Sequence, residues 1–322
     1  MKTCLLLTER FEPTADLLVA EMRRRGVPCV RWNLDQYPFG SSLTYRGDEG
    51  GFRTEIVSDG RTVDLADIGA VWCRGVQADG FPPELDAASK RFAAAEAERS
   101  LAALYTIADV VWVNHPQSHI RANSKPAQLA VAQRLGLDIP PTIISNDPAA
   151  VRAFIAGAQG DVVYKALTQS LETEPGQTLF TSIVTEDALE TLDLIRITPG
   201  IFQRLVPKAY ELRVTVVGRR VFAARIDSQS RAETRVDWRR LPFQVDAVAD
   251  LPQVVEARLH EFMSAFGLAY GAFDFIVTPE GRHVFLEVNP AGQYMWIETK
   301  LGLRITGALA DVLTVPAGDE LG

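Results

Sequence analysis

Strand-like apolar runs alternate with helical patterns over the first third of the chain. The runs are TCLLLT (3–8), PCVRWNL (28–34), GAVWCRG (69–75) and VVWVN (110–114). Residues 14–25 and about 83–108 carry the apolar spacing of helices, and 42–57 holds two short strands around a glycine-rich turn, which predicts a hairpin. This alternation predicts a doubly wound α/β unit over residues 1–118.

A second, smaller α/β unit is expected over residues 119–199. Its pattern is a helix at 120–135, a break at Gly136 and Pro140-Pro141, a strand at 142–147, a helix from Pro148 and a strand at 161–167. The glycine and the two prolines mark the loop between its first helix and its first strand.

From 200 to 322 the pattern changes to long strands joined by tight turns. The strands are GIFQRLV (200–206), ELRVTVVG (211–218), RRVFAARIDS (219–228), GAFDFIVTPEG (271–281) and RHVFLEVNP (282–290). Helical patterns near 251–266 and 299–314 accompany them. Strands that follow one another through short turns predict a largely antiparallel sheet covered by helices, which is an α+β arrangement.

Composition and charge exclude several classes of protein. The chain has 322 residues, of which 47% are apolar and 23% charged, as in ordinary globular proteins. Its 33 basic and 41 acidic residues give a formal charge of −8, so nucleic acid is not expected as a partner. No apolar run approaches the roughly 20 residues of a membrane span, and no membrane partner is expected. Three scattered cysteines in apolar runs suit a reducing cytoplasm.

The segment FDFIVTPEGRHVFLEVNPAGQ (273–293) holds the most informative polar residues. A turn at 278–281 joins two strands, which places Asp274 on one strand and puts Glu287 and Asn289 on the same face of the other. These oxygen donors suit Mg²⁺, which usually shares its ligands with nucleotide phosphates. The alternative is a solvated hairpin face, but the segment is otherwise apolar, and carboxylates left there without a cation would cost several kcal/mol.

Two lysines are candidates for binding phosphates. Lys125 lies in the helical segment NSKPAQLAVAQRLG, and Lys165 ends the strand VVYK. Each can instead be a surface lysine whose stem packs on apolar residues. Lys165 precedes the polar loop TQSLETEPGQTLFTS (168–182), whose backbone N–H groups can close over phosphates.

The segment GIFQRLVPKAYELR (200–213) offers an edge for a nucleotide base. Its candidates are Gln203, Arg204, Leu205, Val206, Lys208 and Glu211. The strand end at 205–207 can present backbone groups to adenine, while Lys208, Gln203 or Glu211 can reach the ribose or the amino group. Arg213 shares a strand face with Glu211 and can meet a transferring phosphoryl group with two parallel hydrogen bonds. The alternative is a surface Glu–Arg pair worth under about 1 kcal/mol.

Other common chemistries find little support in the sequence. No GxGxxG motif follows the first strand, where TERFEPT (8–14) stands, so dinucleotide binding loses its main support. No Cys/His or Ser/His arrangement indicates a covalent nucleophile. His115 and His119 have a spacing that can bind zinc, but Pro116 between them argues against a regular helix there.

Taken together, these motifs resemble the ATP-grasp superfamily of carboxylate–amine and carboxylate–hydroxyl ligases. The resemblance spans about 119–310 and rests on the two lysines, the adenine hinge and the closing Asp…Glu-x-Asn pattern. It implies ATP and Mg²⁺ as cofactors. It also implies an N-terminal pre-ATP-grasp α/β domain (1–118), a central α/β domain (119–199) and a C-terminal ATP-grasp domain (200–322) with a largely antiparallel sheet.

Within that superfamily several sequence stretches are similar to those of the graspetide synthetases, the microviridin-type peptide maturases. The stretches concerned are VWCRG, GLDIPPTIISND, IFQRLVPKAYELRVTVVG, FAARIDSQ, VDWRR and FLEVNPAGQY. The resemblance implies that ATP phosphorylates an Asp or Glu side chain of a ribosomal precursor peptide. A Ser/Thr hydroxyl or Lys amine of that peptide then attacks, which closes an ester or amide macrocycle.

The resemblance also suggests roles for further residues. Lys165 and Arg213 would neutralise the moving charge, while Arg225 and Arg239 would clamp the substrate carboxylate, although either can be a solvated surface arginine. The segment TEDALETLDLIRI (185–197) would bind the leader of the precursor through acidic residues, or simply be solvated. Those acidic residues are Glu186, Asp187, Glu190 and Asp193. Family members generally form homodimers.

Two rival functions remain at this stage. The first is another ATP-grasp ligase, such as a ribosomal-protein glutamate ligase or a ligase of free amino acids, which would use the same nucleotide residues with a small amine acceptor. The second is a non-catalytic nucleotide- or peptide-binding protein on the same fold. A decayed site should lose its ligands first, and here Asp274, Glu287, Asn289 and Lys165 are all present.

Overall fold

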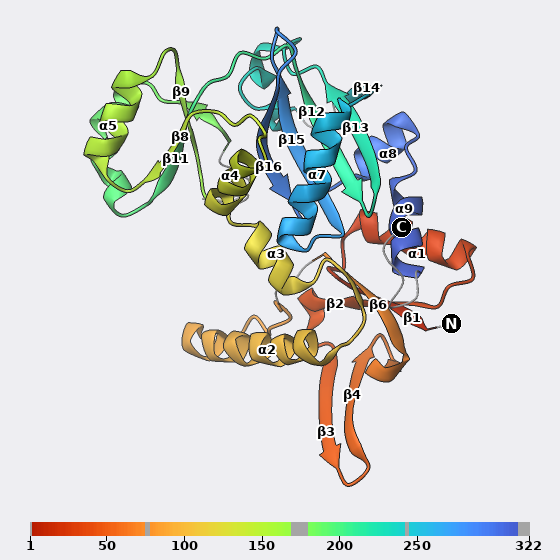
Figure 1. The fold of residues 1–322 in the computed structure, drawn as a ribbon. Coiled ribbons are helices and arrows are strands. Elements are labelled where there is room, and N and C mark those ends of the chain that lie inside the picture. The colour runs from red at the N-terminus through yellow and green to blue at the C-terminus, as the bar shows by residue number, and fades with distance from the viewer. Residues whose placement is uncertain (1, 75–77, 169–179, 242–244, 315–322) are drawn as a thin grey trace.

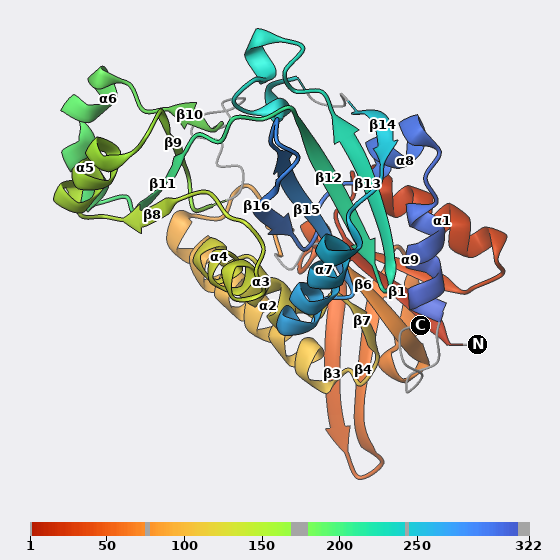
Figure 2. The same ribbon diagram turned by 45° about the horizontal axis from the view of Figure 1, so that its top comes forward.

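The computed structural model shows three units that meet around the C-terminal sheet (Figure 1). It describes residues 2–74, 78–168, 180–241 and 245–314. The N-terminal unit lies below the C-terminal sheet in this view, and the central unit extends to one side of it. A second view shows the N-terminal helix α1 (Pro13–Arg24) beside the last helix α9 (Ile305–Thr314) (Figure 2).

The N-terminal unit contains a four-stranded parallel sheet with the order β2-β1-β6-β7. The strands are β1 (Thr3–Thr8), β2 (Cys29–Asn33), β6 (Ile68–Cys73) and β7 (Val111–Val113). Along β1, Leu6 packs in a core with α1, while Leu5 and Leu7 pack on the other face with α2 (Ala87–Ile107). Both faces are therefore buried, as the apolar runs predict, and the doubly wound α/β unit is confirmed.

A smaller antiparallel sheet extends away from this unit. It consists of β3 (Ser42–Asp48), β4 (Gly51–Ser58) and β5 (Arg61–Asp64). The first two strands form the hairpin that the sequence predicts, and they project beyond the rest of the molecule (Figure 1). The third strand was not expected, since it has only four residues.

The central unit has the sheet order β10-β9-β11-β8. Its elements are β8 (Thr142–Ser145), α5 (Pro148–Gly157), β9 (Val162–Lys165), β10 (Ser182–Ile183), α6 (Glu186–Glu190), the 3-10 helix η3 (Leu192–Arg196) and β11 (Gly200–Arg204). The strand β11 pairs with β8 and β9. We therefore propose to place the boundary with the C-terminal unit after Arg204 and not at residue 199.

The C-terminal unit is a five-stranded antiparallel sheet with the order β14-β13-β12-β15-β16. The strands are β12 (Tyr210–Val217), β13 (Arg220–Ile226), β14 (Val245–Ala249), β15 (Tyr270–Val277) and β16 (His283–Asn289). One face packs on α7 (Gln253–Phe266) and on α4 (Lys125–Arg134). The other face packs on α9, α1 and α8 (Met295–Leu301). The predicted antiparallel α+β unit is confirmed.

Two expected helices are each split in the structure. The pattern at 120–135 forms α3 (Pro116–Ala122) and α4, and that at 299–314 forms α8 and α9. The expectation that Pro116 prevents a helix is wrong. Proline is favoured at the first helical position, where its missing N–H has no helical partner, and His115 caps that helix through its side chain.

Across the described ranges, no helix combines the length and apolar character that crossing a bilayer demands.

Candidate nucleotide site

A cleft of about 870 Å³, including its open mouth, lies where the central sheet faces the C-terminal sheet. One part of its wall is apolar, with Val163, Val206, Ile276 and Leu286, while the other part carries charged side chains. The charged residues are Lys125, Lys165, Arg204, Lys208, Glu211, Asp237, Arg239, Asp274 and Glu287. An apolar wall beside a charged one suits a ligand with a flat base and an anionic tail.

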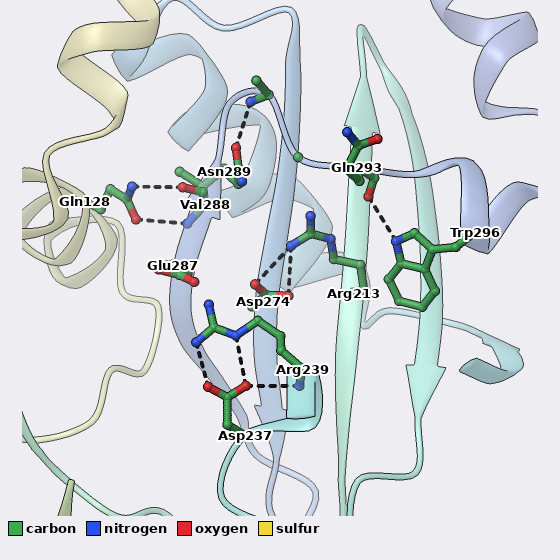
Figure 3. A network of polar contacts seen from close by, with 12 residues as sticks. Gln128, Arg213, Asp237, Arg239, Asp274, Glu287, Val288, Asn289, Gln293 and Trp296 are labelled. Carbon is green, nitrogen blue, oxygen red and sulfur yellow. Dashed lines mark hydrogen bonds and ion pairs between the residues drawn. The ribbon is translucent and has the colours of Figure 1, made fainter. Parts of the chain in front are cut away.

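The predicted acidic residues converge in this cleft. Asp274 on β15 and Glu287 on β16 are directly opposite each other in the antiparallel register, so both side chains lie on the same face of the sheet. Asn289 lies two residues after Glu287 on β16, opposite Ala272, and therefore projects from the same face. Its amide oxygen accepts a hydrogen bond from the N–H of Ala291 at 2.9 Å, at the end of the strand (Figure 3).

Each carboxylate has a cationic partner. One nitrogen of Arg213, Nη1, donates to both oxygens of Asp274 at 3.0 and 3.1 Å, and Lys125 Nζ lies 2.9 Å from Glu287 Oε2. Arg213 lies on β12 opposite Asp274, so it is buried at the site, and the surface Glu–Arg alternative is excluded. Among the described residues, no acceptor pairs with the buried Nε of Arg213. A buried donor without a partner costs free energy, and an anionic ligand that accepts from this N–H would remove that cost.

The electrostatics of the acidic pair fit a divalent cation. Burial raises the pKa of Asp274, and the neighbouring Glu287 carboxylate adds to this rise although Arg213 opposes it. Burial also works against ionisation of Glu287, but Lys125, Arg239 and Lys165 hold its pKa below the usual value. In the described ranges no three His, Cys, Asp or Glu side chains gather as a metal cage of their own. The protein donors therefore suit a Mg²⁺ ion that takes its other ligands from phosphates.

Lys165 lies at the end of β9 and lines the same cleft. Burial lowers its pKa to about 8, with Lys125 and Arg239 adding to the shift and Glu287 opposing it. Lys165 is half-buried among other cations, so its ammonium is not fully solvated and an anionic ligand would stabilise it. Most of the polar loop that follows it, residues 169–179, lies outside the described residues.

The expected adenine hinge lines the apolar part of the cleft. Two of its N–H groups are already used, because Arg204 donates to the carbonyl of Pro141 at 3.0 Å and Leu205 to that of Asp161 at 2.8 Å. Among the described residues the N–H of Val206 has no backbone partner, so this group is available to a base. Gln203 is buried and donates to Thr142 Oγ1 at 2.9 Å, at the edge of the cleft.

Lys208 and Glu211 form a buried ion pair at 2.7 Å, and Lys208 also donates to the carbonyl of Val236 at 3.1 Å. Burial raises the pKa of Glu211, although Lys208 and a hydrogen bond with Ser228 oppose this rise. Both residues line the cleft beside the hinge, where a ribose would follow a base held at Val206.

Arg239 faces the acidic pair from the short helix η5 (Trp238–Arg240) (Figure 3). Asp237 fixes its guanidinium through bonds of 2.9 Å from Nε and 2.6 Å from Nη2. Asp237 also accepts from the N–H of Thr181 at 3.1 Å, which ties this helix to the loop after β9. Burial works against ionisation of Asp237, but Arg239 and these N–H groups keep its pKa well below the usual value.

The structure does not bring Arg225 into the site. It lies on β13 opposite Leu212, whereas Arg213 lies opposite Ala224, so the two arginines project from opposite faces of the sheet. Arg225 stacks over Tyr210 and lies 3.4 Å from Asp246 with 42% of its side chain exposed. We therefore leave Arg225 out of the proposed machinery.

The acidic segment is remote from the cleft. All four of its predicted residues are exposed, three of them on α6 and Asp193 on η3, at the far end of the central unit (Figure 2). Asp193 lies 3.7 Å from Arg152 of α5.

Sequence reasoning missed two residues that organise the site. Gln128 on α4 donates to the carbonyl of Val288 at 2.9 Å and accepts from its N–H at 2.9 Å (Figure 3). This pair of bonds fixes α4 on the edge strand β16 and thereby holds Lys125 beside Glu287. Asp237 is the second residue, and its only sequence signal is its place in the VDWRR stretch.

Comparisons with known proteins agree with this geometry. Residues 4–120 match the family model of the MvdD pre-ATP-grasp domain. A RiPP-associated ATP-grasp ligase from Chryseobacterium gregarium, solved with ADP and a leader and core peptide, is 31% identical, covers 99% of both chains and has a TM-score of 0.90. No curated protein matches the sequence.

Two macrocyclases from Microcystis aeruginosa are similarly close. MdnC, solved with the precursor peptide MdnA, is 31% identical over 97% of this chain and 99% of its own, with a TM-score of 0.86. MdnB is 30% identical over 98% and 99%, with a TM-score of 0.82. The chain therefore belongs to the graspetide synthetases, the microviridin-type ATP-grasp ligases that act on ribosomally made peptides.

Proposed function

We propose that this ATP-dependent ligase phosphorylates Asp or Glu side chains of a ribosomal precursor peptide and closes side-chain ester or amide rings. The observation that carries the proposal is the row of Arg213, Asp274 and Glu287 across three adjacent strands. Asp274 and Glu287 line one cleft together with Lys125, Lys165 and Arg239. This arrangement can hold the phosphates of ATP beside a second anion, which is what activation of a carboxylate requires.

The apolar part of the cleft would take the adenine ring, with Val206 at its edge and the Lys208–Glu211 pair near the ribose. Lys125 and Lys165 would bind the phosphates, since both ammonium groups lie at the charged end of the cleft. Asp274, Glu287 and Asn289 would hold Mg²⁺. When bound, this ion supplies positive charge to the phosphate oxygens and lowers the cost of transfer.

A carboxylate is a poor acceptor of nucleophiles because of its charge. Transfer of the terminal phosphoryl group from ATP to a carboxylate oxygen gives ADP and an acyl phosphate. Its carboxyl group is no longer a carboxylate anion, and its acyl carbon carries phosphate as a good leaving group. Arg213 and Arg239 would face the substrate carboxylate and the phosphoryl oxygens with their guanidinium groups. The peptide hydroxyl or amine then adds to the acyl carbon, loses its proton, and expels phosphate.

The acidic segment is our candidate for binding the leader peptide. Its exposed carboxylates can accept basic residues of a partner, and the neighbouring Leu194 and Ile197 expose 62% and 80% of their surface. A site that is remote from the cleft can bind the leader throughout the reaction while the core peptide moves through the cleft. We also propose a homodimer that acts in the cytoplasm, where ATP and nascent ribosomal peptides are available.

The test is to incubate the protein with the precursor peptide encoded beside it and Mg-ATP. Each ring removes one water, so the peptide should lose about 18 Da per ring together with one ADP released. A ligase that adds amino acids would increase the mass of the peptide, and a non-catalytic binding protein would leave both peptide and ATP unchanged.

A further inference from the structure

The 290–293 turn follows the strand β16 and lies against Arg213. Gly292 has no room for a side chain, because a Cβ there would lie 2.4 Å from Arg213 Nη2 and 2.5 Å from the Ala272 Cβ. The turn also bonds to Asn289, whose carbonyl accepts from the N–H of Gly292 at 3.2 Å and whose side chain accepts from Ala291. A shift of this turn would therefore move both Asn289 and Arg213.

The N-terminal unit holds this turn through a buried ion pair. Arg74, directly after β6, donates to the carbonyls of Ala291 and Gly292 and to Glu12 Oε2, the last at 3.0 Å. Glu12 also accepts from Gln293 Nε2 at 2.9 Å. The side chains of Arg74 and Glu12 are only 5% and 12% exposed, so the pair is shielded from competing water.

Two further groups fix the turn from its other side. Asn114, at the end of β7, donates to the carbonyl of Pro290 at 2.8 Å and to that of Tyr270 at 2.7 Å. The hydroxyl of Tyr270 donates to the carbonyl of Gly292 at 2.5 Å. The backbone of the turn is thus bound by side chains of the N-terminal unit and of β15.

Another ion pair between the same two parts of the chain serves as a comparison. Arg25, just after α1, lies 2.5 Å from Asp311 and donates to the carbonyl of Gly307 at 3.0 Å, both on α9. It therefore links the N- and C-terminal units with the same chemistry as Arg74. Its partners lie on a helix that carries no proposed site residue, whereas one partner of Arg74, Gly292, lies against Arg213.

We propose that Arg74 and Glu12 are positioning residues, through which the N-terminal unit holds the 290–293 turn and with it Arg213 and Asn289 in the arrangement that phosphoryl transfer requires. This inference rests on the function proposed above. It gives the N-terminal unit a direct part in turnover, although none of the residues described in that unit (2–74 and 78–118) lines the nucleotide cleft.

The experiment compares Arg74→Lys with Arg25→Lys in the full chain. A lysine keeps the charge, but its one nitrogen replaces the two guanidinium nitrogens of Arg74, of which Nη1 reaches the carbonyls and Nη2 reaches Glu12. We expect Arg74→Lys to lower kcat for ring closure about tenfold or more, with the KM for ATP and for precursor within about twofold of wild type. Arg25→Lys should leave kcat within about twofold.

A second measurement is independent of activity. Hydrogen–deuterium exchange of the metal-free, ligand-free protein should be about tenfold faster at the amides of 291–293 in Arg74→Lys than in wild type, and unchanged there in Arg25→Lys. Should Arg74→Lys not fold, Glu12→Gln takes its place, because it keeps the side-chain volume and removes the charge partner.

Equal losses of kcat in the two lysine variants, or unchanged kcat and exchange in the Arg74 variant, would overturn the inference. Failure of the proposed function gives a different result. In that case wild type itself closes no ring, and the exchange measurement alone decides whether Arg74 holds the turn.

Discussion

Replacing Arg213 with lysine separates the chemistry of the site from its stability. In the structure Arg213 Nη1 bonds to both oxygens of Asp274 at 3.0 and 3.1 Å, while Nη2 lies against Gly292. A lysine can reach one oxygen of Asp274, but it offers no second nitrogen toward the turn. We therefore expect Arg213→Lys to keep its charge and to lose the two-nitrogen geometry.

The magnitude follows from the burial of the pair. Its side chains are 8% and 11% exposed, so the loss of one charge-assisted hydrogen bond should lower the free energy of unfolding by about 1.5–3 kcal/mol. A donor that stabilises developing charge in a closed site contributes about 3–4 kcal/mol to the barrier, which corresponds to roughly 100–1000-fold in kcat. The loss in free energy of unfolding is smaller than the roughly 5–15 kcal/mol by which folded proteins are usually stable, so the variant should stay folded while its turnover falls by about two to three orders of magnitude.

The assay measures precursor-dependent ADP release and ring formation in parallel, with thermal unfolding as the check on folding. The matched control is Arg225→Lys, on the next strand but the opposite face, where a half-exposed pair with Asp246 is worth about 1 kcal/mol or less. It should turn over within about twofold of wild type. The reasoning is refuted if Arg213→Lys keeps kcat within about threefold of wild type, or if it releases ADP normally and closes no ring.

Three further predictions concern the metal, the leader and the pH dependence. Glu287→Gln should fold and lose at least about 100-fold in kcat, since an amide cannot replace the carboxylate beside Mg²⁺ and Lys125; Mg-dependent turnover at the wild-type rate would remove Glu287 from the site. Reversing Asp187 and Glu190 to lysine should weaken precursor binding by calorimetry and leave ATP binding unchanged; equal precursor affinity would place the leader elsewhere. Because burial lowers the pKa of Lys165 to about 8, its charge is present below pH 8 and lost above it, so kcat/KM for ATP should fall as pH rises through 8. Lys165→Arg should abolish that fall, and an identical pH profile in this variant would assign it to another group.

The acidic pair could be predicted because its geometry is local. The turn at 278–281 brings β15 and β16 together, and strand alternation then sets the faces of Asp274, Glu287 and Asn289. Lys165 could be proposed as a phosphate-binding residue because it ends a short apolar strand. The segment expected to bind adenine lines the cleft, but the backbone partners that use the N–H groups of Arg204 and Leu205 are not visible in the sequence.

The position of Arg225 could also have been worked out. The turn at 218–219 pairs Val217 with Arg220, and counting back along both strands places Arg213 opposite Ala224. Arg225 then has the opposite orientation. This register needs only the turn length, which the sequence shows.

The supporting contacts could not be predicted, because they join residues far apart in the chain. Gln128 bonds to Val288 across 160 positions, and Arg74 reaches Gly292 across 218. Arg74 stands in the VWCRG stretch that resembles the family, but that stretch does not indicate its partners, and Gln128 stands in none of the resembling stretches. Their partners are backbone groups, which leave no mark in a single sequence.

The mass of the peptide product tests the central claim most directly. Wild-type protein, the neighbouring precursor peptide and Mg-ATP should give a peptide that is lighter by about 18 Da for each ring, with one ADP for each water lost. Tandem mass spectrometry should place each loss between an Asp or Glu and a Ser, Thr or Lys of the same chain. ATP consumed with the peptide mass unchanged or increased would contradict the assignment of this chain as a macrocyclase.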